Sequence, residues 1–263
     1  MKEQFLLFYS LLAARYVIIA GVAFVVFYKL FTSRFARFKI QALFPTRRDY
    51  VREVGYSFFT FFVFALIGVL LASPATRPYT RIYSNISDYG WGYLLLSVVL
   101  ALLIHDTYFY WTHRLMHHPR LFKLFHLTHH RSTNPSPWAA FAFSPLEAVV
   151  EGSIIFVIAV LIPIHSVAIL LFLLFMTVYN VYGHLGYEIY PAWLVNSRLG
   201  KWLNTSTNHN MHHKYFRGNY GLYCRFWDEL LQTTHPNYDK ALASLVYQEQ
   251  EIEKAPTPRN AQL

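Results

Sequence analysis

Cysteine is nearly absent from this chain of 263 residues. The single cysteine, Cys224, excludes an internal disulfide and an iron–sulfur cluster, because each needs more than one thiolate. Any metal ion that the protein binds must therefore be held by imidazole or carboxylate groups.

Charged residues are scarce as well. They make up 14% of the chain, against roughly 25% in ordinary soluble domains, while hydrophobic residues make up 55%. This composition indicates a membrane protein. The net charge of +9 would suit a nucleic-acid-binding protein. In so apolar a chain we expect the basic excess to mark the cytoplasmic side of a membrane instead, and we expect no nucleic-acid partner.

Apolar runs predict four to five transmembrane helices, because a helix needs about 20 residues to cross a bilayer. The candidate spans are residues 5–30, 54–72, 91–111, 147–162 and 165–183. The last two are short and are separated by Pro163, so a helical hairpin that barely crosses is the alternative for this pair. The fold class is therefore all-α, an integral membrane bundle.

Basic residues between the spans predict which helix ends face the cytoplasm. The first connection and its flanks carry Lys29, Arg34, Arg37, Lys39, Arg47, Arg48 and Arg52, whereas the second connection carries only Arg77 and Arg81. The positive-inside rule places the first connection in the cytoplasm. Residues 113–130 and 184–213 then follow on the cytoplasmic side, and His165 falls on the opposite side.

Histidines form three clusters in those cytoplasmic segments. The clusters read "HRLMH", "HLTHH" and "HNMHH", and they contain His113 and His117, then His126, His129 and His130, then His209, His212 and His213. Residues three and four apart share a helix face, so each cluster can direct several imidazoles at one place. These eight histidines, with His184 as a ninth candidate, are too many ligands for one metal ion, but they are enough for two metal ions. We expect a cytoplasmic helical cap that holds a two-metal site.

Ligating imidazoles need hydrogen-bond partners that fix their tautomers. The candidates for this role near the clusters are His105, Asp106, Glu147, Asn180, Glu188, Asn208 and Asp228. His105 could equally be a ligand. We expect no metal at His118, which precedes a proline, or at His235, which follows the last cluster in "THPNY".

The residues around the clusters resemble the sterol desaturase / fatty acid hydroxylase superfamily. The resemblance rests on "HDTYFYWTHRLMHH", "FHLTHHRSTNPSPWAAFAFSPLEAVVEG" and "NHNMHHKYFRGNYGLYCRFWDELLQT", which match the pattern HxxxH, HxxHH, HxxHH without a gap. Within the superfamily, the run from Pro137 to Glu147 and the "NYG…WD" run are most similar to sterol C-5 desaturases. The resemblance covers roughly residues 90–240.

This resemblance implies a membrane-bound, non-haem di-iron oxidoreductase that uses molecular oxygen. It assigns the role of iron ligand to the eight clustered histidines and, less directly, to His184, with no catalytic residue separate from the metal centre. It makes residues 91–240 the catalytic domain, while hydropathy and composition predict N-terminal transmembrane helices with a basic loop at residues 1–90 and a polar tail at residues 241–263. The substrate would be a sterol, a fatty acyl chain or a related lipid, and both hydroxylation and desaturation stay open.

The chain has no "HPGG" haem-binding element and no glycine-rich nucleotide loop, so we expect electrons from an external donor. A cytochrome b5-like protein, or a ferredoxin with its reductase, would suit the basic cytoplasmic face. We expect the bacterial inner membrane in preference to the endoplasmic reticulum, with the active site on the cytoplasmic side. The competing hypotheses are a membrane metal transporter or store, and a membrane zinc enzyme.

Overall fold

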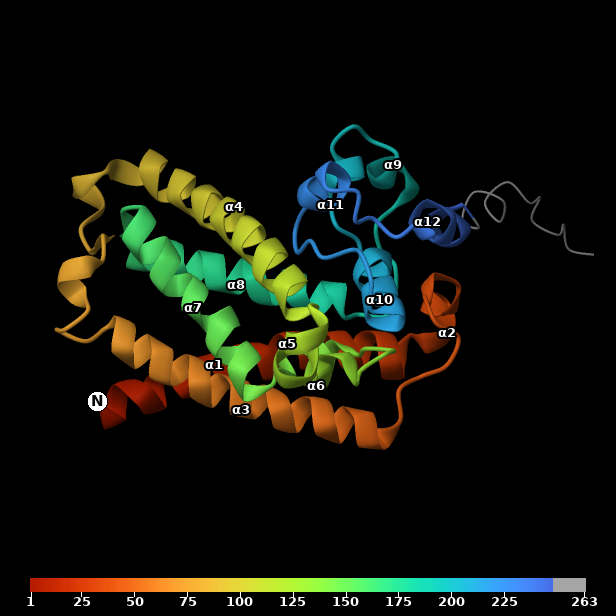
Figure 1. Ribbon diagram of the computed structural model, residues 1–263, viewed down its shortest axis with the longest axis horizontal. Helices are drawn as coiled ribbons and strands as arrows, with labels where there is room; N and C mark the ends of the chain where they lie inside the picture. Colours follow the sequence, from red (N-terminus) through yellow and green to blue (C-terminus); the bar gives the residue numbers. More distant parts are fainter. Residues whose placement is uncertain (248–263) are drawn as a thin grey trace, which may run out of the picture.

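The computed structural model describes residues 1–247, and the rest of the predicted polar tail lies outside the described residues. The described part is almost entirely helical (Figure 1). Its α-helices are α1 (Lys2–Val25), α2 (Thr32–Phe35), α3 (Arg47–Leu71), α4 (Gly90–Met116), α5 (Pro119–Phe125), α6 (Leu127–His130), α7 (Pro145–Leu161), α8 (Ser166–Gly183), α9 (Ala192–Val195), α10 (Ser206–Tyr215), α11 (Phe226–Leu230) and α12 (Tyr238–Val246).

Short elements join these helices. A π-helical turn, η1 (Val26–Leu30), extends α1, and the 3-10 turns are η2 (Ala36–Phe38), η3 (Arg77–Tyr79), η4 (Ile86–Asp88), η5 (Pro137–Phe141) and η6 (Gly200–Trp202). Two-residue strands β1 (Ile82–Tyr83) and β2 (Ile164–His165) pair in parallel.

Four helices are long and apolar enough to cross a membrane: α1 with η1, α3, α4 and α8. The prediction of four to five spans is therefore met at its lower bound. The helix α7 has 17 residues, and it packs within the bundle against α3 and α4. An all-α membrane bundle is confirmed.

Capping residues explain where two of the bundle helices begin. Thr46 and Asp49 form a reciprocal capping box that starts α3 before its apolar run. Ser144 and Glu147 form a second box at α7, where Pro145 occupies the first helical position. Each box satisfies amide groups that the first turn of a helix leaves unpaired. The second box also fixes the position of Glu147 close to the histidines.

The two ends of the bundle differ sharply. At one end β1 and β2 join the α3–α4 connection to the α7–α8 turn, which places His165 beside Tyr83. At the other end lie the short helices α5, α6 and α10, together with the connection between α1 and α3 (Figure 1). That connection bonds to the segment after α8, where the Ile40 amide donates to the Gly186 carbonyl. The first basic connection and the histidine segments therefore share one end, as the sequence predicted.

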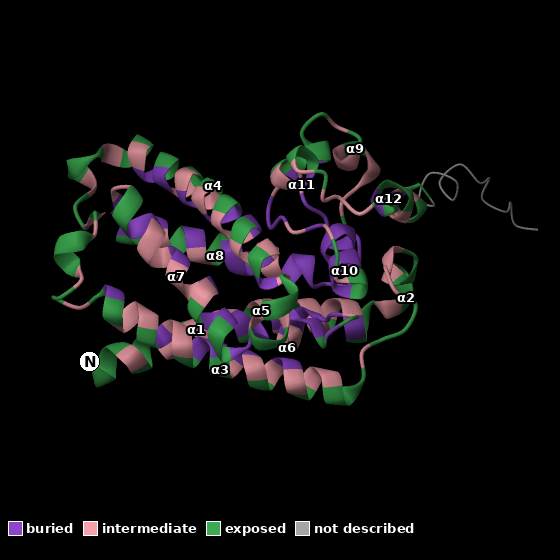
Figure 2. Ribbon diagram, viewed as in Figure 1, coloured by how far each residue is buried: buried purple, intermediate pink, exposed green. Residues whose placement is uncertain are grey.

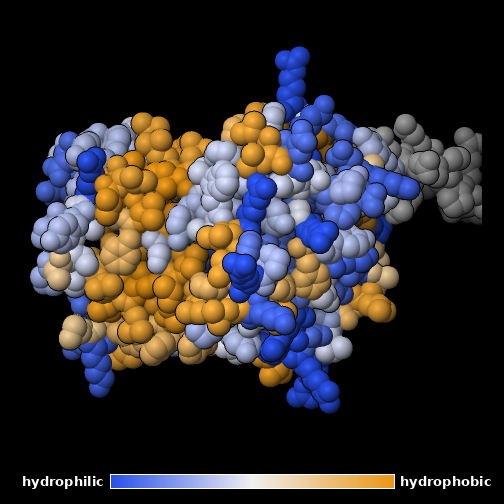
Figure 3. All heavy atoms as spheres, in the orientation of Figure 1, coloured by the Kyte–Doolittle hydropathy of each residue, from blue (hydrophilic) through white to orange (hydrophobic). Residues whose placement is uncertain are grey.

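Burial follows the same division. The helix α10 is buried on nearly all sides, whereas the outer faces of the long helices are exposed (Figure 2). Those outer faces carry apolar side chains, and they form an orange band between hydrophilic ends in Figure 3. Such a band is what a bilayer-spanning bundle presents to lipid.

Candidate metal centre

All nine predicted ligand histidines come together in two groups. The first group contains His113, His117, His126, His130 and His212, and the second contains His129, His184, His209 and His213. Within each group one ligand nitrogen from every residue lies within 4.8 Å of the others. No further group of this kind, with three or more histidine, cysteine or carboxylate side chains, occurs in residues 1–247.

Helix geometry divides each HxxHH motif between the two groups. In the first such motif His126 and His130, four residues apart, belong to the five-histidine group, while His129 belongs to the other. Neighbouring helical positions lie about 100° apart around the axis, so adjacent histidines must point in different directions. Each of these motifs therefore supplies both groups.

The helix α10 repeats this division in reverse. His209 and His213 belong to the four-histidine group, and His212 between them points to the five-histidine group. The remaining ligand positions come from helix ends: His113 and His117 close α4, and His184 caps α8.

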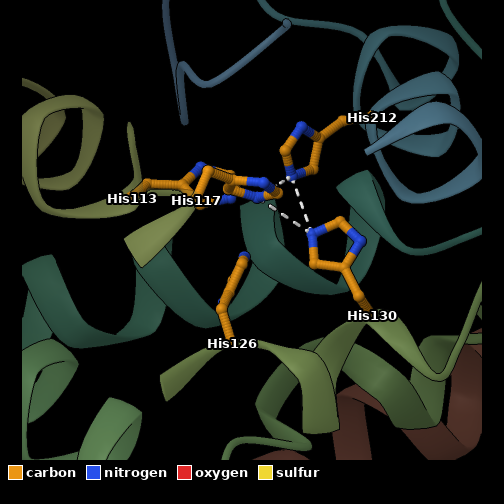
Figure 4. Close-up of side chains that lie close together, drawn as sticks. All are labelled: His113, His117, His126, His130 and His212. Atoms are coloured by element: carbon orange, nitrogen blue, oxygen red, sulfur yellow. Dashed lines mark hydrogen bonds between the residues drawn. The ribbon is translucent and has the colours of Figure 1, made fainter. Parts of the chain in front are cut away.

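The imidazoles of the first group converge, with ring nitrogens facing one another (Figure 4). In the first group the Nε2 atoms of His117, His130 and His212 lie 3.0–3.1 Å apart. In the second group His184 Nε2 lies 3.0 Å from His209 Nε2 and 3.2 Å from the Nε2 atoms of His129 and His213. Converging ring nitrogens of this kind cannot all satisfy each other by hydrogen bonds, because each neutral ring has only one N–H.

Backbone carbonyls fix the tautomer of three rings. The Nδ1 atoms of His113, His184 and His212 lie 2.7–2.9 Å from the carbonyl oxygens of Tyr220, Asn180 and Gly218, respectively. A carbonyl only accepts, so Nδ1 carries the proton in each ring and Nε2 keeps its lone pair. These three Nε2 atoms are thus prepared for a metal ion.

Burial keeps the rings neutral. It lowers the pKa of His184 to about 4 and of His117 to about 2, and neighbouring imidazoles lower the pKa of His117 further. Burial also holds the pKa values of His129 and His213 well below the ordinary value. The neutral imidazole is the form that binds metal, so this environment favours ligation over protonation.

Glu147 is the one predicted carboxylate partner that contacts an imidazole directly. Its Oε1 lies 2.6 Å from His126 Nδ1, and both side chains are buried. Asn180 acts through its backbone carbonyl on His184, while its side-chain amide donates to the Ala140 carbonyl.

The other predicted partners stabilise the loops around the site. Asp106 accepts from the amides of Tyr223 and Cys224, and Asp228 accepts from those of Tyr220 and Gly221. Because the Tyr220 carbonyl in turn anchors His113, Asp228 acts on the five-histidine group through one residue.

The three remaining predicted partners are Glu188, His105 and Asn208. Within residues 1–247, their side chains form no hydrogen bond to a histidine of either group. Glu188 accepts from the amide and hydroxyl of Thr207. His105 lies outside both groups, with Nδ1 2.9 Å from the Tyr223 hydroxyl. Asn208 is buried, and its side-chain amide has no hydrogen-bond partner.

The backbone carbonyls that accept from the histidine Nδ1 atoms could not be predicted from the sequence, because every residue type has a backbone carbonyl. The nearest signal was the "RGNYG" run. Gly218 has φ +73°, and a Cβ there would lie 2.5 Å from the Thr233 carbonyl oxygen. Only glycine fits this turn, which aims the Gly218 carbonyl at His212.

The histidines expected not to bind metal lie outside both groups. His118 and His235 each accept a backbone amide two residues on, from Arg120 and Asn237, and so serve as local caps. His165 does the same for Val167 at the opposite end of the bundle.

The family model described as Fatty acid hydroxylase matches residues 98–233, more than half of the chain and all nine clustered histidines. The chain belongs to the fatty acid hydroxylase family. No solved structure matches it significantly.

Curated relatives of this hydroxylase-family chain carry sterol-related names. A Delta(7)-sterol 5(6)-desaturase of Gibberella zeae is 32% identical over 177 residues, which is 67% of this chain and 53% of the relative. The lathosterol oxidase of Mus musculus is 32% identical over 156 residues, covering 59% and 50%. That of Homo sapiens is 26% identical over 181 residues, covering 68% and 59%. The chain thus spans about half the length of the curated relatives it matches.

Proposed function

We propose that this protein is an oxygen-dependent membrane lipid oxidoreductase, a hydroxylase or desaturase, with two irons held by histidine. The observation that carries the proposal is the pair of histidine groups, five and four residues, at the end of an apolar bundle. The donor set fits iron, for which imidazole is a suitable ligand. Nε2 of His113 and Nε2 of His126 are buried and have no hydrogen-bond partner in the described chain, so both are free to bind a metal ion.

When bound, two irons supply the activation of molecular oxygen that removal of hydrogen from an unactivated C–H bond requires. His113, His117, His126, His130 and His212 would hold one iron, and His129, His184, His209 and His213 the other. The protein contributes orientation. The carbonyls of Tyr220, Asn180 and Gly218 keep Nδ1 protonated, and Glu147 turns His126 toward the centre.

The names of the relatives support a lipid substrate. Two of them are called lathosterol oxidase and one a sterol desaturase. We propose a sterol, a fatty acyl chain or a related lipid as the substrate class, with hydroxylation and desaturation as the two possible outcomes.

We further propose that electrons reach the site from an acidic donor at the capped end. A cavity of about 730 Å³ beside His117 opens there, and Lys123 and Arg217 are among its lining residues. A cytochrome b5-like protein, or a ferredoxin with its reductase, has the complementary charge. The basic α1–α3 connection supports a cytoplasmic location for this end. A bacterial inner membrane stays a prediction, and the three relatives named above come from a fungus and two mammals.

Two other functions compete less well. A metal transporter would need a polar route through the spans, and both histidine groups lie at one end of the bundle. A catalytic zinc ion takes three protein ligands and a water, which leaves most of nine converging imidazoles unexplained.

Metal analysis tests the proposal. The full chain is purified in mild detergent without chelator or histidine tag, beside the double variant His129→Ala/His212→Ala, which removes one ligand from each group. We expect about two irons per chain in the wild type and their loss in the variant. Stoichiometric zinc, or no metal with no oxygen-dependent turnover after reconstitution with iron, would refute the di-iron oxidase.

A further inference from the structure

The outer face of α4 carries a row of side chains that runs toward the capped end of the bundle. Leu103, Trp111 and Leu115 are all exposed, and their spacing of four or eight residues places them on one helix face. The helix is one of the four that are long and apolar enough to cross a membrane. We therefore expect lipid along this α4 row.

The short helix α11 packs beside the α4 row, and not beyond the end of α4 (Figure 1). The Trp227 Nε1 donates to the Thr107 hydroxyl over 3.3 Å, and the Trp227 ring lies 5.6 Å from that of Trp111. Thr107 is about 14 Å along the helix axis from the end of α4 at Met116. The helix α11 thus lies level with the last turns of a membrane span.

Apolar side chains continue from the α4 row over α11. Phe226 and Leu230 are 49% and 60% exposed, and Trp202 in η6 is 50% exposed. The Phe226 ring lies 5.3 Å from that of Trp227 and 6.5 Å from that of Trp202. Figure 3 shows an apolar area over α11, at the upper edge of the capped end. We call Trp202, Phe226 and Leu230 the α11 patch.

Basic side chains flank the α11 patch. Lys201 is exposed and directly precedes Trp202, and Arg114 lies in the last turn of α4. Glu229, the exposed acid of α11, forms an ion pair with Arg225, which balances its charge. Aromatic and basic side chains together are typical of the boundary between acyl chains and anionic head groups.

We propose that the α11 patch inserts into the surface of the membrane leaflet at the capped end, among head groups and the first part of the acyl chains. A helix seated in this way lies roughly 5–10 Å into the boundary between head groups and chains. Asp228 of the same helix accepts from the amides of Tyr220 and Gly221. Insertion would therefore also hold the loop beside the five-histidine group against the membrane. The inference requires only the membrane bundle and is independent of the proposed reaction.

The main alternative occupant of the α11 patch is a second copy of the chain. A stable interface between proteins takes about 20–30 residues on each side, whereas the patch consists of three side chains. A partner of sufficient size would have to cover the α4 row as well, where the span meets lipid. Lipid is the occupant that covers both surfaces together.

Fluorescence quenching in vesicles tests the proposal with the full chain. The vesicles contain phosphatidylcholine and phosphatidylglycerol, and Cys224→Ser removes the single cysteine. A fluorescent label is then attached through Leu230→Cys or Trp202→Cys. Leu103→Cys on α4 is the control within a span, and Lys240→Cys is the matched control on an exposed position of α12. Both patch labels and the Lys240 label lie at the capped end, so mixed orientation in the vesicles affects them equally.

We expect both patch labels to lose most of their fluorescence to a lipid nitroxide near the head group and little to aqueous iodide. The Leu103 label should respond mainly to a nitroxide near the chain end, and the Lys240 label only to iodide. Iodide quenching of both patch labels equal to that of the Lys240 label, without quenching by either lipid, would refute insertion. Protection from all three quenchers, together with a dimer in light scattering, would assign the patch to a second copy instead.

A measurement on the wild type needs no substitution. The protein is placed in vesicles that contain a lipid with a photoactivatable group near its head group, and the labelled peptides are identified by mass spectrometry. Labelling of residues 226–230 is the expected result. Labelling confined to the four spans would overturn the assignment of lipid to the α11 patch.

Discussion

Replacing Glu147 with glutamine should weaken metal binding at one of the two proposed positions and leave the other unchanged. Glu147 contacts His126, a member of the five-histidine group, and no member of the four-histidine group. Loss of such a carboxylate partner typically lowers metal affinity 10- to 100-fold, or about 1.4–2.7 kcal/mol. Glutamine keeps the volume of the side chain and can still complete the capping box with Ser144. The change therefore acts on the hydrogen bond to His126 and spares the helix start.

The assay is release of iron under chelator titration, followed by mass spectrometry of the metal that stays bound. The wild type should release two irons over one range of chelator concentration. The variant should release one iron at 10- to 100-fold lower chelator and the second as in the wild type. Glu53→Gln is the matched control, because Glu53 is equally buried but accepts from the hydroxyls of Ser132 and Ser136. Unchanged release in Glu147→Gln, or equal loosening in Glu53→Gln, would refute the reasoning.

Three further predictions concern stability. Burial lowers the pKa of His117 to about 2 and that of His184 to about 4, so the unfolded chain takes up protons before the folded chain does as the pH falls below about 6.5. The free energy of unfolding of the metal-free protein should therefore fall by about 2 kcal/mol per ring between pH 6.5 and 5. Chemical unfolding measures this change, and a stability that does not vary with pH would contradict it. Asp228→Asn should lower the free energy of unfolding by roughly 1–3 kcal/mol. It should also weaken iron binding, because Asp228 holds the loop whose Tyr220 carbonyl anchors His113. Iron retention equal to that of the wild type would contradict this connection between Asp228 and His113. Gly152→Val should lower the free energy of unfolding by about 1–3 kcal/mol, because a Cβ there would lie 2.5 Å from the Ile67 side chain. Thermal unfolding measures this loss. An unchanged melting temperature would contradict the prediction and would mean that α3 shifts to make room.

Much of the candidate metal centre could be predicted, because its histidines lie at helical spacing. The i and i+4 positions of His126 and His130 share a helix face and join one group, whereas His129 joins the other. The division of each HxxHH motif between two groups could not be predicted. It depends on where α6 and α10 lie relative to each other, which neither motif specifies.

The sequence predicted the existence of the bundle helices better than the residues at which they begin. Mean hydropathy identifies the spans, yet α3 begins at Arg47, seven residues before the apolar run, because the Thr46 box starts the helix there. The acidic residues near the clusters looked alike in sequence. Glu147 contacts a histidine because its box places it there, whereas Asp106 points to backbone amides of a loop more than a hundred residues away.

The interlocked histidine groups have a consequence for assembly of the site. The helices α6 and α10 each supply ligands to both groups, so neither metal position can form while either helix is misplaced. Both helices are short, and α6 has only four residues, so neither is stable alone. Their ligands are therefore held by the bundle on one side and by the Gly218–Tyr220 turn on the other. A site built in this way needs no rigid domain of its own. It stays at one end of the bundle, where Glu147 on α7 contacts His126.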